Sequence, residues 1–456
     1  MKKRVGLKSS ISTTHVIMLS FLLTILLGSV LLVLPISTVS GVSVPYIDAL
    51  FTATSATCVT GLVTLTTAST WSVFGQIVIL LLIQIGGLGI ITIMSALMVF
   101  LHRKMRLGER LLVQDAFNLN TLSGLAGFIK KVIAGTFLVE GIGALLYMTV
   151  FIPAFGGKGI WISVFTSISA FCNAGIDIIG ENSLFEFACN PLINIVTCTL
   201  IVLGGIGYIV WWDLVRVFKD ARKKGISIFR HLTLHSKIAI VTTLILIFTG
   251  GLLFLLFEYN NPATIGSLGF YDKLQVSFFQ SITTRTAGFA TIDQQSLTAA
   301  STALSIFLMF IGGSPVGTAG GIKTVTIAVL AATAFSAIKN RDSTTMFHRN
   351  IERSTVRKAI AICGMAFLIT FISTLCLAFA MPEASLPELL YEAVSATATV
   401  GLSRNLTALL STAGKLIITA TMYLGRIGPI SLALALNPKK ENPNIIKNPI
   451  EEISVG

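Results

Sequence analysis

Hydrophobic residues in this chain gather into long runs that carry no acidic or basic side chain, and short polar segments separate the runs. A helix needs roughly 20 apolar residues to cross a lipid bilayer, and runs of about that length occupy 15–36, 76–100, 192–212, 238–257 and 359–381. The first run is too long for the core of a signal peptide, and no small-residue cleavage site follows it. We therefore predict that these runs are membrane-spanning helices of the mature protein.

Shorter apolar segments lie between the long runs, and each of them ends in a loop that contains glycine. Because they are too short to cross a membrane, we predict re-entrant helices at 45–56, 159–170, 271–283 and 386–396. Each follows a long outer helix, predicted at 13–36, 128–152, 236–257 and 356–380. Each precedes a long inner helix, predicted at 72–99, 191–215, 302–338 and 413–436. The pattern predicts eight full spans and four half-spans.

The four glycine loops recur at a nearly constant interval. Their last residues, Gly61, Gly175, Gly288 and Gly401, are 114, 113 and 113 residues apart. A fixed period indicates a repeat architecture, and non-helical backbone at membrane depth is tolerated only where protein or water surrounds it. We therefore predict an all-α polytopic membrane protein in which four tandem helix–re-entrant pore helix–helix repeats surround a central pseudo-fourfold pore. The predicted repeats comprise 1–105, 106–225, 226–345 and 346–456.

Composition and charge placement agree with a multi-pass membrane protein. The chain is 54% hydrophobic and 12% charged, with a mean hydropathy of +0.85, whereas a soluble domain is about 25% charged. Most of the 33 basic residues fall in the N-terminal segment, the tail and three segments between spans. Because basic residues stay on the cytoplasmic side, we predict that both termini are cytoplasmic. This placement explains the net charge of +13 without a nucleic-acid partner.

The chemistry of the four loops favours a monovalent cation. Rings of backbone carbonyl oxygens coordinate a dehydrated alkali ion, and glycine adopts the unusual dihedral angles that such loops need. The loops contain no Asp or Glu, so they lack the carboxylate rings expected of a divalent-cation site. The alternative is that the four glycines are ordinary turn residues. The predicted ion-binding residues are Thr57, Cys58, Val59, Thr60, Gly61, Cys172, Asn173, Ala174, Gly175, Thr284, Arg285, Thr286, Ala287, Gly288, Thr397, Ala398, Thr399, Val400 and Gly401.

Each predicted inner helix contains a second glycine cluster. The clusters at 86–89 and 204–207 are typical of close packing between membrane helices. In the third inner segment, five glycines and Pro315 fall between 312 and 323, and no stable helix should cross such a stretch. We predict two half-helices joined by a flexible loop below the four glycine loops. A kinked packing helix is the alternative.

Charged residues within the predicted membrane segments are expected to be functional, because burying an ionised side chain in lipid is expensive. We expect Arg426 to form an electrostatic barrier or to tether the 312–323 loop, with snorkelling or a structural pair with a carboxylate as the alternative. We expect Arg285 to point behind its loop or outward and to pair with an acid. Lys323 is expected to end the flexible loop near the cytoplasmic mouth, and Glu140 to serve packing rather than ion coupling.

The loop sequences resemble those of the Trk/Ktr/HKT superfamily of potassium transporters. Residues 51–62 (FTATSATCVTGL) are similar to the first loop of that family, and residues 283–289 (TTRTAGF) are close to its third. The similarity covers nearly the whole chain and is greatest to the KtrB membrane subunit of bacterial Ktr systems. It implies a selectivity filter with one key glycine per repeat and, from Gly61, a preference for potassium. Phe171 and Asn173 depart from the threonine-rich pattern of the other loops.

The resemblance also implies a gate and a set of partners. The gate would be an intramembrane loop in the third repeat, beside an arginine of the fourth. The predicted gate residues are Gly312, Gly313, Ser314, Pro315, Val316, Gly317, Thr318, Ala319, Gly320, Gly321, Lys323 and Arg426. The implied assembly is a homodimer in the lipid of the bacterial plasma membrane, with a cytoplasmic ring of RCK-type, KtrA-like regulators. Nucleotide is expected only on that ring, because this chain has no nucleotide-binding motif; K⁺ in the filter is its only expected ligand.

Three classes of function remain at this stage. The leading hypothesis is channel-like potassium uptake down the electrochemical gradient, gated by the cytoplasmic regulator, with sodium dependence as an expectation from the family. The alternative is a gradient-coupled K⁺/Na⁺ symporter, which would need intramembrane acids, and only Glu140 is available. We predict that the chain is not an enzyme, because its five histidines lie near cytoplasmic ends and no HExxH motif or buried acid pair is evident.

Overall fold

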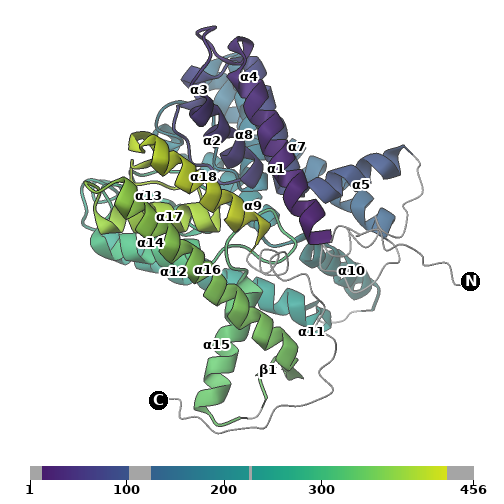
Figure 1. Ribbon diagram of the computed structural model, residues 1–456. Coiled ribbons are helices and arrows are strands. Elements are labelled where there is room, and N and C mark those ends of the chain that lie inside the picture. Colours follow the sequence, from purple (N-terminus) through teal and green to yellow (C-terminus); the bar gives the residue numbers. More distant parts are fainter. Residues whose placement is uncertain (1–12, 102–124, 225–227, 342, 429–456) are drawn as a thin grey trace, which may run out of the picture.

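The computed structural model describes residues 13–101, 125–224, 228–341 and 343–428 (Figure 1). Its elements are almost all helices, as the sequence predicts. Long and short helices alternate along the chain, and the four short helices that end in glycine loops point into the interior of the molecule. The all-α architecture and its order of elements therefore agree with the hydrophobic pattern.

The four outer helices are long and apolar. They are α1 (Thr13–Val33), α7 (Leu125–Phe155), α12 (Leu234–Glu258) and α16 (Arg353–Ala380), and each is long and apolar enough to cross a membrane. Large hydrophobic side chains cover their outward faces, and Phe379 of α16 is 92% exposed. An exposed apolar surface of this kind marks a contact with membrane or protein, which agrees with the predicted membrane location.

Each outer helix packs against the short helix that follows it. The short helices are α2 (Tyr46–Cys58), α8 (Lys158–Cys172), α13 (Phe270–Thr283) and α17 (Leu386–Ala398). Their buried faces are rich in serine and threonine, and these small side chains let the helices approach one another closely. All four end at or just before the predicted glycine loops.

The first two inner helices differ from the prediction because both are broken. A bend of 96° separates α4 (Val73–Leu88) from α5 (Ile90–Phe100), and a bend of 97° separates α9 (Pro191–Gly205) from α10 (Tyr208–Lys224). Gly89 and Gly207 stand at the two bends with φ angles of 84° and 94°. These angles are outside the helical range and favour glycine, so the prediction of continuous helices at 72–99 and 191–215 is wrong.

The third inner segment divides into α14 (Ala299–Phe310) and α15 (Thr324–Ile338), with the predicted loop between them. The fourth contains α18 (Thr412–Ile427), and its predicted continuation to 436 lies outside the described residues. Within the described residues, four helices are long and apolar enough to span a membrane, or six if each bent pair is one span. The prediction of unbroken inner spans is therefore wrong for the first two repeats, and the break in the third agrees with the predicted loop.

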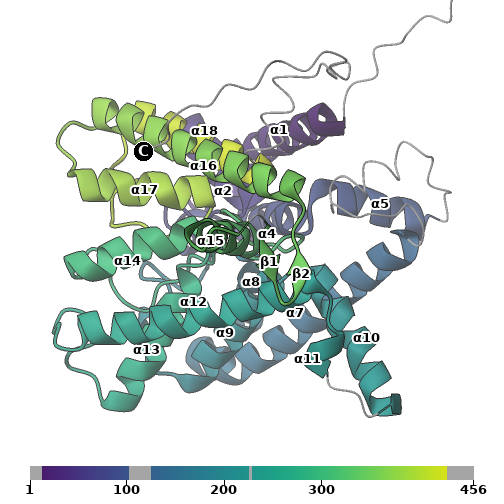
Figure 2. The same ribbon diagram turned by 90° about the horizontal axis from the view of Figure 1, so that it is seen from below.

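Small elements complete the fold. They are η1 (Pro35–Ser37), α3 (Thr67–Thr70), η2 (Phe185–Phe187), α11 (Ile228–His231), η3 (Thr407–Leu409) and a hairpin of β1 (Thr345–Met346) and β2 (Arg349–Asn350). Helix α15 projects from the rest of the molecule with the hairpin at its foot (Figure 1), and it is seen nearly end-on in Figure 2. The ring of Phe347, in the hairpin turn, lies 6.1 Å from that of Phe229 in α11. This contact holds the hairpin against α11.

Capping residues and a shared core position the inner helices. Side-chain oxygens cap their N-termini, which satisfies backbone N–H groups at each start; the capping residues are Ser72, Asn190, Thr298 and Ser411. The largest buried apolar cluster joins α2 and α4 to α7, α8 and α9. The first two repeats therefore share one core, which fixes α4 against α8 at the level of the glycine loops.

Candidate functional site

The four loop glycines form a closed ring. Each ring glycine packs against the residue that precedes the next ring glycine. A Cβ atom on the first glycine would lie less than 3.0 Å from the carbonyl oxygen of that preceding residue. The carbonyls that Gly61, Gly175, Gly288 and Gly401 meet in this way are those of Ala174, Ala287, Val400 and Thr60. The fourth contact returns to the first loop. Four segments far apart in the sequence thus meet around one point.

The four loops share one backbone conformation. Each ring glycine has a positive φ, with values of 96°, 63°, 87° and 94° along the chain. The residue two positions earlier is left-handed in every loop, although none is glycine; these residues are Val59, Asn173, Thr286 and Thr399. Left-handed backbone is unfavourable for β-branched residues, and such strain persists only where the surroundings hold it in place. The repetition indicates one structural requirement that all four loops meet.

Hydrogen bonds from the loop N–H groups run back to the short helices. In the first loop, the N–H of Thr60 donates to Ser55 O at 2.8 Å, and the N–H of Gly61 donates to Ser55 Oγ at 3.1 Å. The fourth loop repeats both bonds at the same distances with Ser395. Because these N–H groups are used on the helix side, the carbonyl oxygens of Thr60, Ala174, Ala287 and Val400 are the backbone groups that lie against the ring glycines.

Several loop hydroxyls are buried without a hydrogen-bond partner in the part of the chain that the structure describes. They belong to Thr57, Thr60, Thr286 and Thr399. An unpaired buried hydroxyl is costly, and neutral oxygens are the ligands that a monovalent cation takes from a protein. The donor set of the loops, carbonyl and hydroxyl oxygens without carboxylate, therefore fits an alkali cation as a passing substrate.

The second loop reaches the same backbone with different side chains. The Phe171 ring packs edge-on against Trp211 of α10, with centroids 5.7 Å apart, and so lies away from the ring of glycines. With its amide nitrogen turned toward α9, Asn173 donates to Ala170 O and Ile201 O at 3.1 and 3.2 Å. The side chains of Phe171 and Asn173, the two residues that depart from the threonine-rich pattern, are thus engaged with α8, α9 and α10.

The 312–323 loop is hydrogen-bonded to the break between α9 and α10. The N–H groups of Ser314 and Thr318 donate to Gly205 O and Gly204 O at 2.8 and 3.1 Å, and the N–H of Tyr208 donates to Val316 O at 3.0 Å. The hydroxyl of Thr318 donates to Phe171 O at 3.0 Å, at the end of α8. The loop therefore lies directly against the second glycine loop and occupies the bend that the sequence analysis missed.

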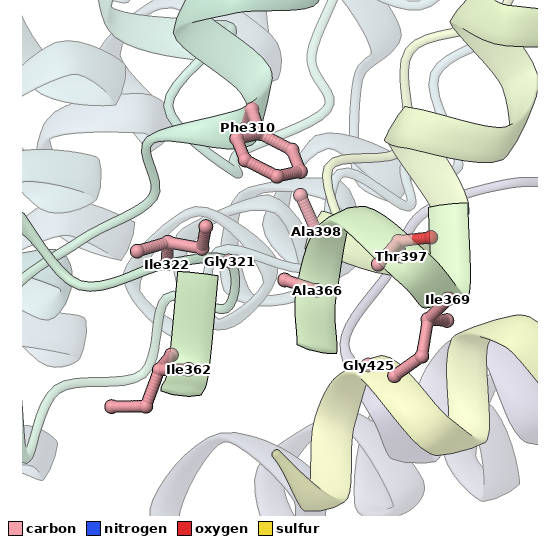
Figure 3. Close-up of a pocket in the computed structure, with 9 residues that line it drawn as sticks. All are labelled: Phe310, Gly321, Ile322, Ile362, Ala366, Ile369, Thr397, Ala398 and Gly425. Carbon is pink, nitrogen blue, oxygen red and sulfur yellow. The ribbon is translucent and has the colours of Figure 1, made fainter. Parts of the chain in front are cut away.

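The other side of the 312–323 loop faces the fourth repeat. A Cβ atom on Gly320 would lie less than 3.0 Å from Thr399 Oγ1 and Ala398 O. Beside this contact is a small, mostly apolar pocket between the loop, α16, α17 and α18 (Figure 3). Its lining residues are Phe310, Gly321, Ile322, Ile362, Ala366, Ile369, Thr397, Ala398 and Gly425. The loop is thus hydrogen-bonded to repeat 2 and bordered by an apolar space toward repeat 4.

Arg426 joins the 312–323 loop to the first repeat. Its Nη1 donates to Thr318 O at 2.7 Å, and its Nη2 donates to Gly86 O at 2.6 Å. Charge-assisted hydrogen bonds are stronger than neutral ones, so this contact supports the tether that was one of the sequence expectations. Lys323, in contrast, donates to Ala319 O of its own loop at 2.6 Å.

Arg285 and Glu140 contact neighbours that the sequence does not reveal. The guanidinium of Arg285 lies behind its loop, as expected, but it donates to Thr243 Oγ1 of α12 at 3.5 Å. The expectation of an acidic partner is wrong, since the described ion pairs are Arg216–Asp213 and Lys415–Asp48. Glu140 accepts from the Gln84 side-chain amide of α4, which agrees with a packing role.

Three glycines of the inner helices make one repeated contact, which agrees with the close packing expected of the clusters at 86–89 and 204–207 and was not foreseen for Gly425. A Cβ atom on Gly86, Gly204 or Gly425 would lie less than 3.0 Å from a carbonyl at the end of a short helix. In each case this is the carbonyl four residues before the ring glycine, in Thr57, Phe171 or Thr397. A positive-φ glycine follows three residues later at Gly89, Gly207 and Gly428. The G-x-x-G spacing was the available signal.

Comparison with known proteins agrees with this geometry. Residues 6–447 match the family model of TrkH, described as a cation transport protein. The chain is 39% identical over 443 residues to the "Ktr system potassium uptake protein B" of Bacillus subtilis, with 97% of this chain and 96% of that protein covered. It is 37% identical over 461 residues to the "Potassium/sodium uptake protein NtpJ" of Enterococcus hirae, covering 100% and 99%.

The fold also matches a solved structure. The potassium transporter TrkH from Vibrio parahaemolyticus superposes with a TM-score of 0.75 at 16% identity, covering 95% of this chain and 87% of that one. The chain is therefore a membrane transporter of the TrkH family of cation transport proteins. This confirms the resemblance identified in the loops, and it confirms that the protein is not an enzyme.

Proposed function

We propose that this protein takes up potassium across the bacterial plasma membrane through a channel-like pore, with the glycine ring as its selectivity filter. The observation that carries the proposal is the closed ring of four loops, which repeat the same two positive φ angles and each set a carbonyl oxygen against the glycine of a neighbouring loop. K⁺ would bind there, and the chain needs no cofactor of its own. The names of the B. subtilis and E. hirae relatives support potassium as the ion.

Uptake through such a pore can be driven by the membrane potential and needs no chemical reaction in this chain. A negative interior contributes about 2.3 kcal/mol per elementary charge for each 100 mV of membrane potential, which favours cation entry. The four short helices end beside the loops, and their C-terminal ends carry partial negative charge. The pore would therefore attract a cation into the middle of the membrane without a carboxylate in the filter.

Flux would be gated by the 312–323 loop and Arg426. The loop lies under two of the four filter loops, and Arg426 holds it against α4. We further propose a homodimer with both termini in the cytoplasm and a ring of RCK-type, KtrA-like subunits that binds nucleotide and moves this loop. The name of the B. subtilis relative, a protein of a "Ktr system", supports a partner, and the predicted basic cytoplasmic segments would receive it.

A K⁺/Na⁺ symporter is the second candidate. The E. hirae relative, named for potassium and sodium uptake, favours a role for sodium. However, the intramembrane acid Glu140 already accepts from Gln84. This engagement favours sodium as an activator over sodium carried through a coupling acid.

Purified protein in liposomes tests the proposal. K⁺ uptake driven by an imposed negative potential should be inhibited weakly by Na⁺, and Gly401→Ser should remove much of this discrimination because its side chain would displace the Thr60 carbonyl. Gly364→Ser is the matched control, since a Cβ there meets no atom within 4 Å. Unchanged ion preference in Gly401→Ser would overturn the filter assignment. Sodium entering in fixed ratio to potassium would select the symporter.

A further inference from the structure

We propose that Glu140 is a positioning residue for the second filter loop, and that it acts through Gln84 and Cys172 to hold that loop in its potassium-selective geometry. The inference deepens the proposed filter and rests on it. It gives a function to the one acid buried within the second outer helix, whose partner the sequence leaves unknown.

Glu140, Gln84 and Cys172 form a cluster directly behind the second filter loop. The amide nitrogen of Gln84 lies 3.2 and 3.3 Å from the two carboxylate oxygens of Glu140. The thiol of Cys172 lies 3.7 Å from the amide oxygen of Gln84 and 3.9 Å from Glu140 Oε1, within reach of a sulfur hydrogen bond to either. The three side chains come from α4, α7 and the end of α8, so the cluster joins two repeats.

The surrounding backbone makes room for this cluster and fixes its register. A Cβ atom on Gly87 would lie less than 3.0 Å from the Sγ and Cβ of Cys172, so the thiol occupies the space that this glycine leaves open. The hydroxyl of Ser167 in α8 donates to the backbone carbonyl of Glu140 at 2.6 Å. Both ends of the contact are therefore fixed, because α8 holds the backbone of α7 at Glu140 and α4 surrounds the thiol of Cys172.

Packing of an outer helix on a short helix does not itself need an acid. In the third repeat, Ser281 Oγ of α13 donates to Ile247 O of α12 at 3.0 Å, which is the counterpart of the Ser167–Glu140 contact. The residue corresponding to Glu140 is thus an isoleucine. The Glu140 side chain is only 4% exposed, and burying a carboxylate is costly unless its hydrogen bonds are specific. The third repeat has isoleucine at this position, so the second repeat bears the cost of a buried carboxylate that helix packing alone does not require.

The second filter loop has the greatest need of such support. Cys172 is three residues before Gly175, and between them lie the left-handed Asn173 and Ala174, whose carbonyl packs against Gly61. This loop contributes no threonine hydroxyl to the ring. Its contribution depends on backbone position alone, and a displacement of Cys172 moves the carbonyl of Ala174 directly.

Substitution of Glu140 tests the proposal by ion competition in liposomes and by K⁺- and Na⁺-dependent thermal stabilisation of the purified protein. Glu140→Ala should lower the preference for K⁺ over Na⁺ about tenfold, which corresponds to about 1.4 kcal/mol, and should weaken stabilisation by K⁺ relative to Na⁺. Glu140→Gln keeps the hydrogen bonds and should stay within about twofold of the unmodified protein. Leu138→Ala, on the lipid-facing side of α7, is the matched control and should change neither readout.

Cys172→Ala reaches the same cluster from the filter side and covers the case in which Glu140→Ala fails to fold. It should cause a similar loss, and the Glu140→Ala/Cys172→Ala double variant should lose little more than either single variant. Additive losses would overturn the proposal, as would equal losses in Glu140→Gln and Glu140→Ala, which would assign the effect to charge or ion coupling. Gly401→Ser is measured alongside: if it too leaves ion preference unchanged, the filter assignment has failed instead.

Discussion

The glycine ring repeats one arrangement four times, whereas the layer of broken inner helices beneath it does not. In the ring, four loops of different sequence adopt the same pair of positive φ angles and the same packing against a neighbour's carbonyl. In the layer beneath, two inner segments bend by 96° and 97°, while the third opens into the 312–323 loop. In the proposed pore, an ion on the axis would need equivalent oxygens on all sides, whereas one obstructing loop would be enough to control flux.

Sequence similarity among the repeats therefore reflects a shared backbone geometry more than a shared side-chain chemistry. Phe171 and Thr397 hold the same position four residues before a ring glycine, and both present a carbonyl to an inner-helix glycine. Arg285 and Cys172 likewise share a position three residues before the ring glycine, yet contact different groups behind it. The backbone is repeated, and the side chains behind it are specialised.

The largest effect is expected from shortening the 312–323 loop. Deletion of residues 315–318 removes the Thr318 contacts and its bond to Arg426 together. Because each hydrogen bond contributes about 1 kcal/mol, flux without a regulator should rise about a hundredfold, with K⁺ preference retained. Flux of ⁸⁶Rb⁺ into liposomes measures both. If the deletion protein folds and its flux is unchanged, the 312–323 loop is not a gate, and its difference from the symmetric ring has no role in flux.

A smaller effect is expected from Arg426→Gln. The substitution removes the two hydrogen bonds that tie the loop to Gly86 and Thr318 and also removes a buried charge. Since the neutral glutamine amide can replace part of these two bonds, we expect a net loss of about 1.4 kcal/mol, so regulator-free flux should rise about tenfold. Lys415→Gln on the same helix is the control, because its ion pair with Asp48 lies far from the loop in sequence and contact. An equal rise in both variants would contradict a local tether.

A still smaller effect on flux is expected from Thr318→Val. It removes the single hydroxyl bond between the 312–323 loop and the Phe171 carbonyl and leaves the shape nearly unchanged. The expected loss is about 1 kcal/mol, which corresponds to roughly a fivefold rise in basal flux. Ion preference should not change, because Phe171 contributes no side chain to the ring. A changed K⁺/Na⁺ ratio with unchanged flux would show that this contact supports the filter instead of the gate.

The smallest effect is expected from Ser385→Ala at the start of α17. Ser385 and Glu388 form a capping box, in which the Ser385 hydroxyl accepts from the backbone N–H of Glu388 and the Glu388 carboxylate accepts from the backbone N–H of Ser385. Loss of a capping serine costs about 1 kcal/mol. A lower unfolding temperature with unchanged flux and ion preference is expected, measured by thermal melting and the liposome assay. Altered selectivity would mean that the filter depends on the far end of the short helix.

The sequence was sufficient to predict the glycine ring because its signal is local and repeated. Each ring glycine follows a short helix at nearly the same interval, and the outer and short helices agree with the predicted ranges within a few residues. The break in the third inner segment was predictable for the same reason, since glycine and proline act on their own backbone.

The bends at Gly89 and Gly207 were not predictable from local sequence. Glycine clusters in apolar runs are equally typical of close helix packing, and these clusters both pack, through Gly86 and Gly204, and bend three residues later. The partners of isolated polar residues could not be predicted from the sequence either. Arg285 finds Thr243, and Glu140 finds Gln84, across contacts that only the assembled fold creates.

The closure of the ring between Gly401 and the Thr60 carbonyl has a consequence for biosynthesis. During translation, the first loop enters the membrane long before its last neighbour has been made. A nascent chain released after three repeats has no group to fill the place of Gly401, and its ring stays open on one side. The ring is therefore completed only when the final quarter of the polypeptide leaves the ribosome.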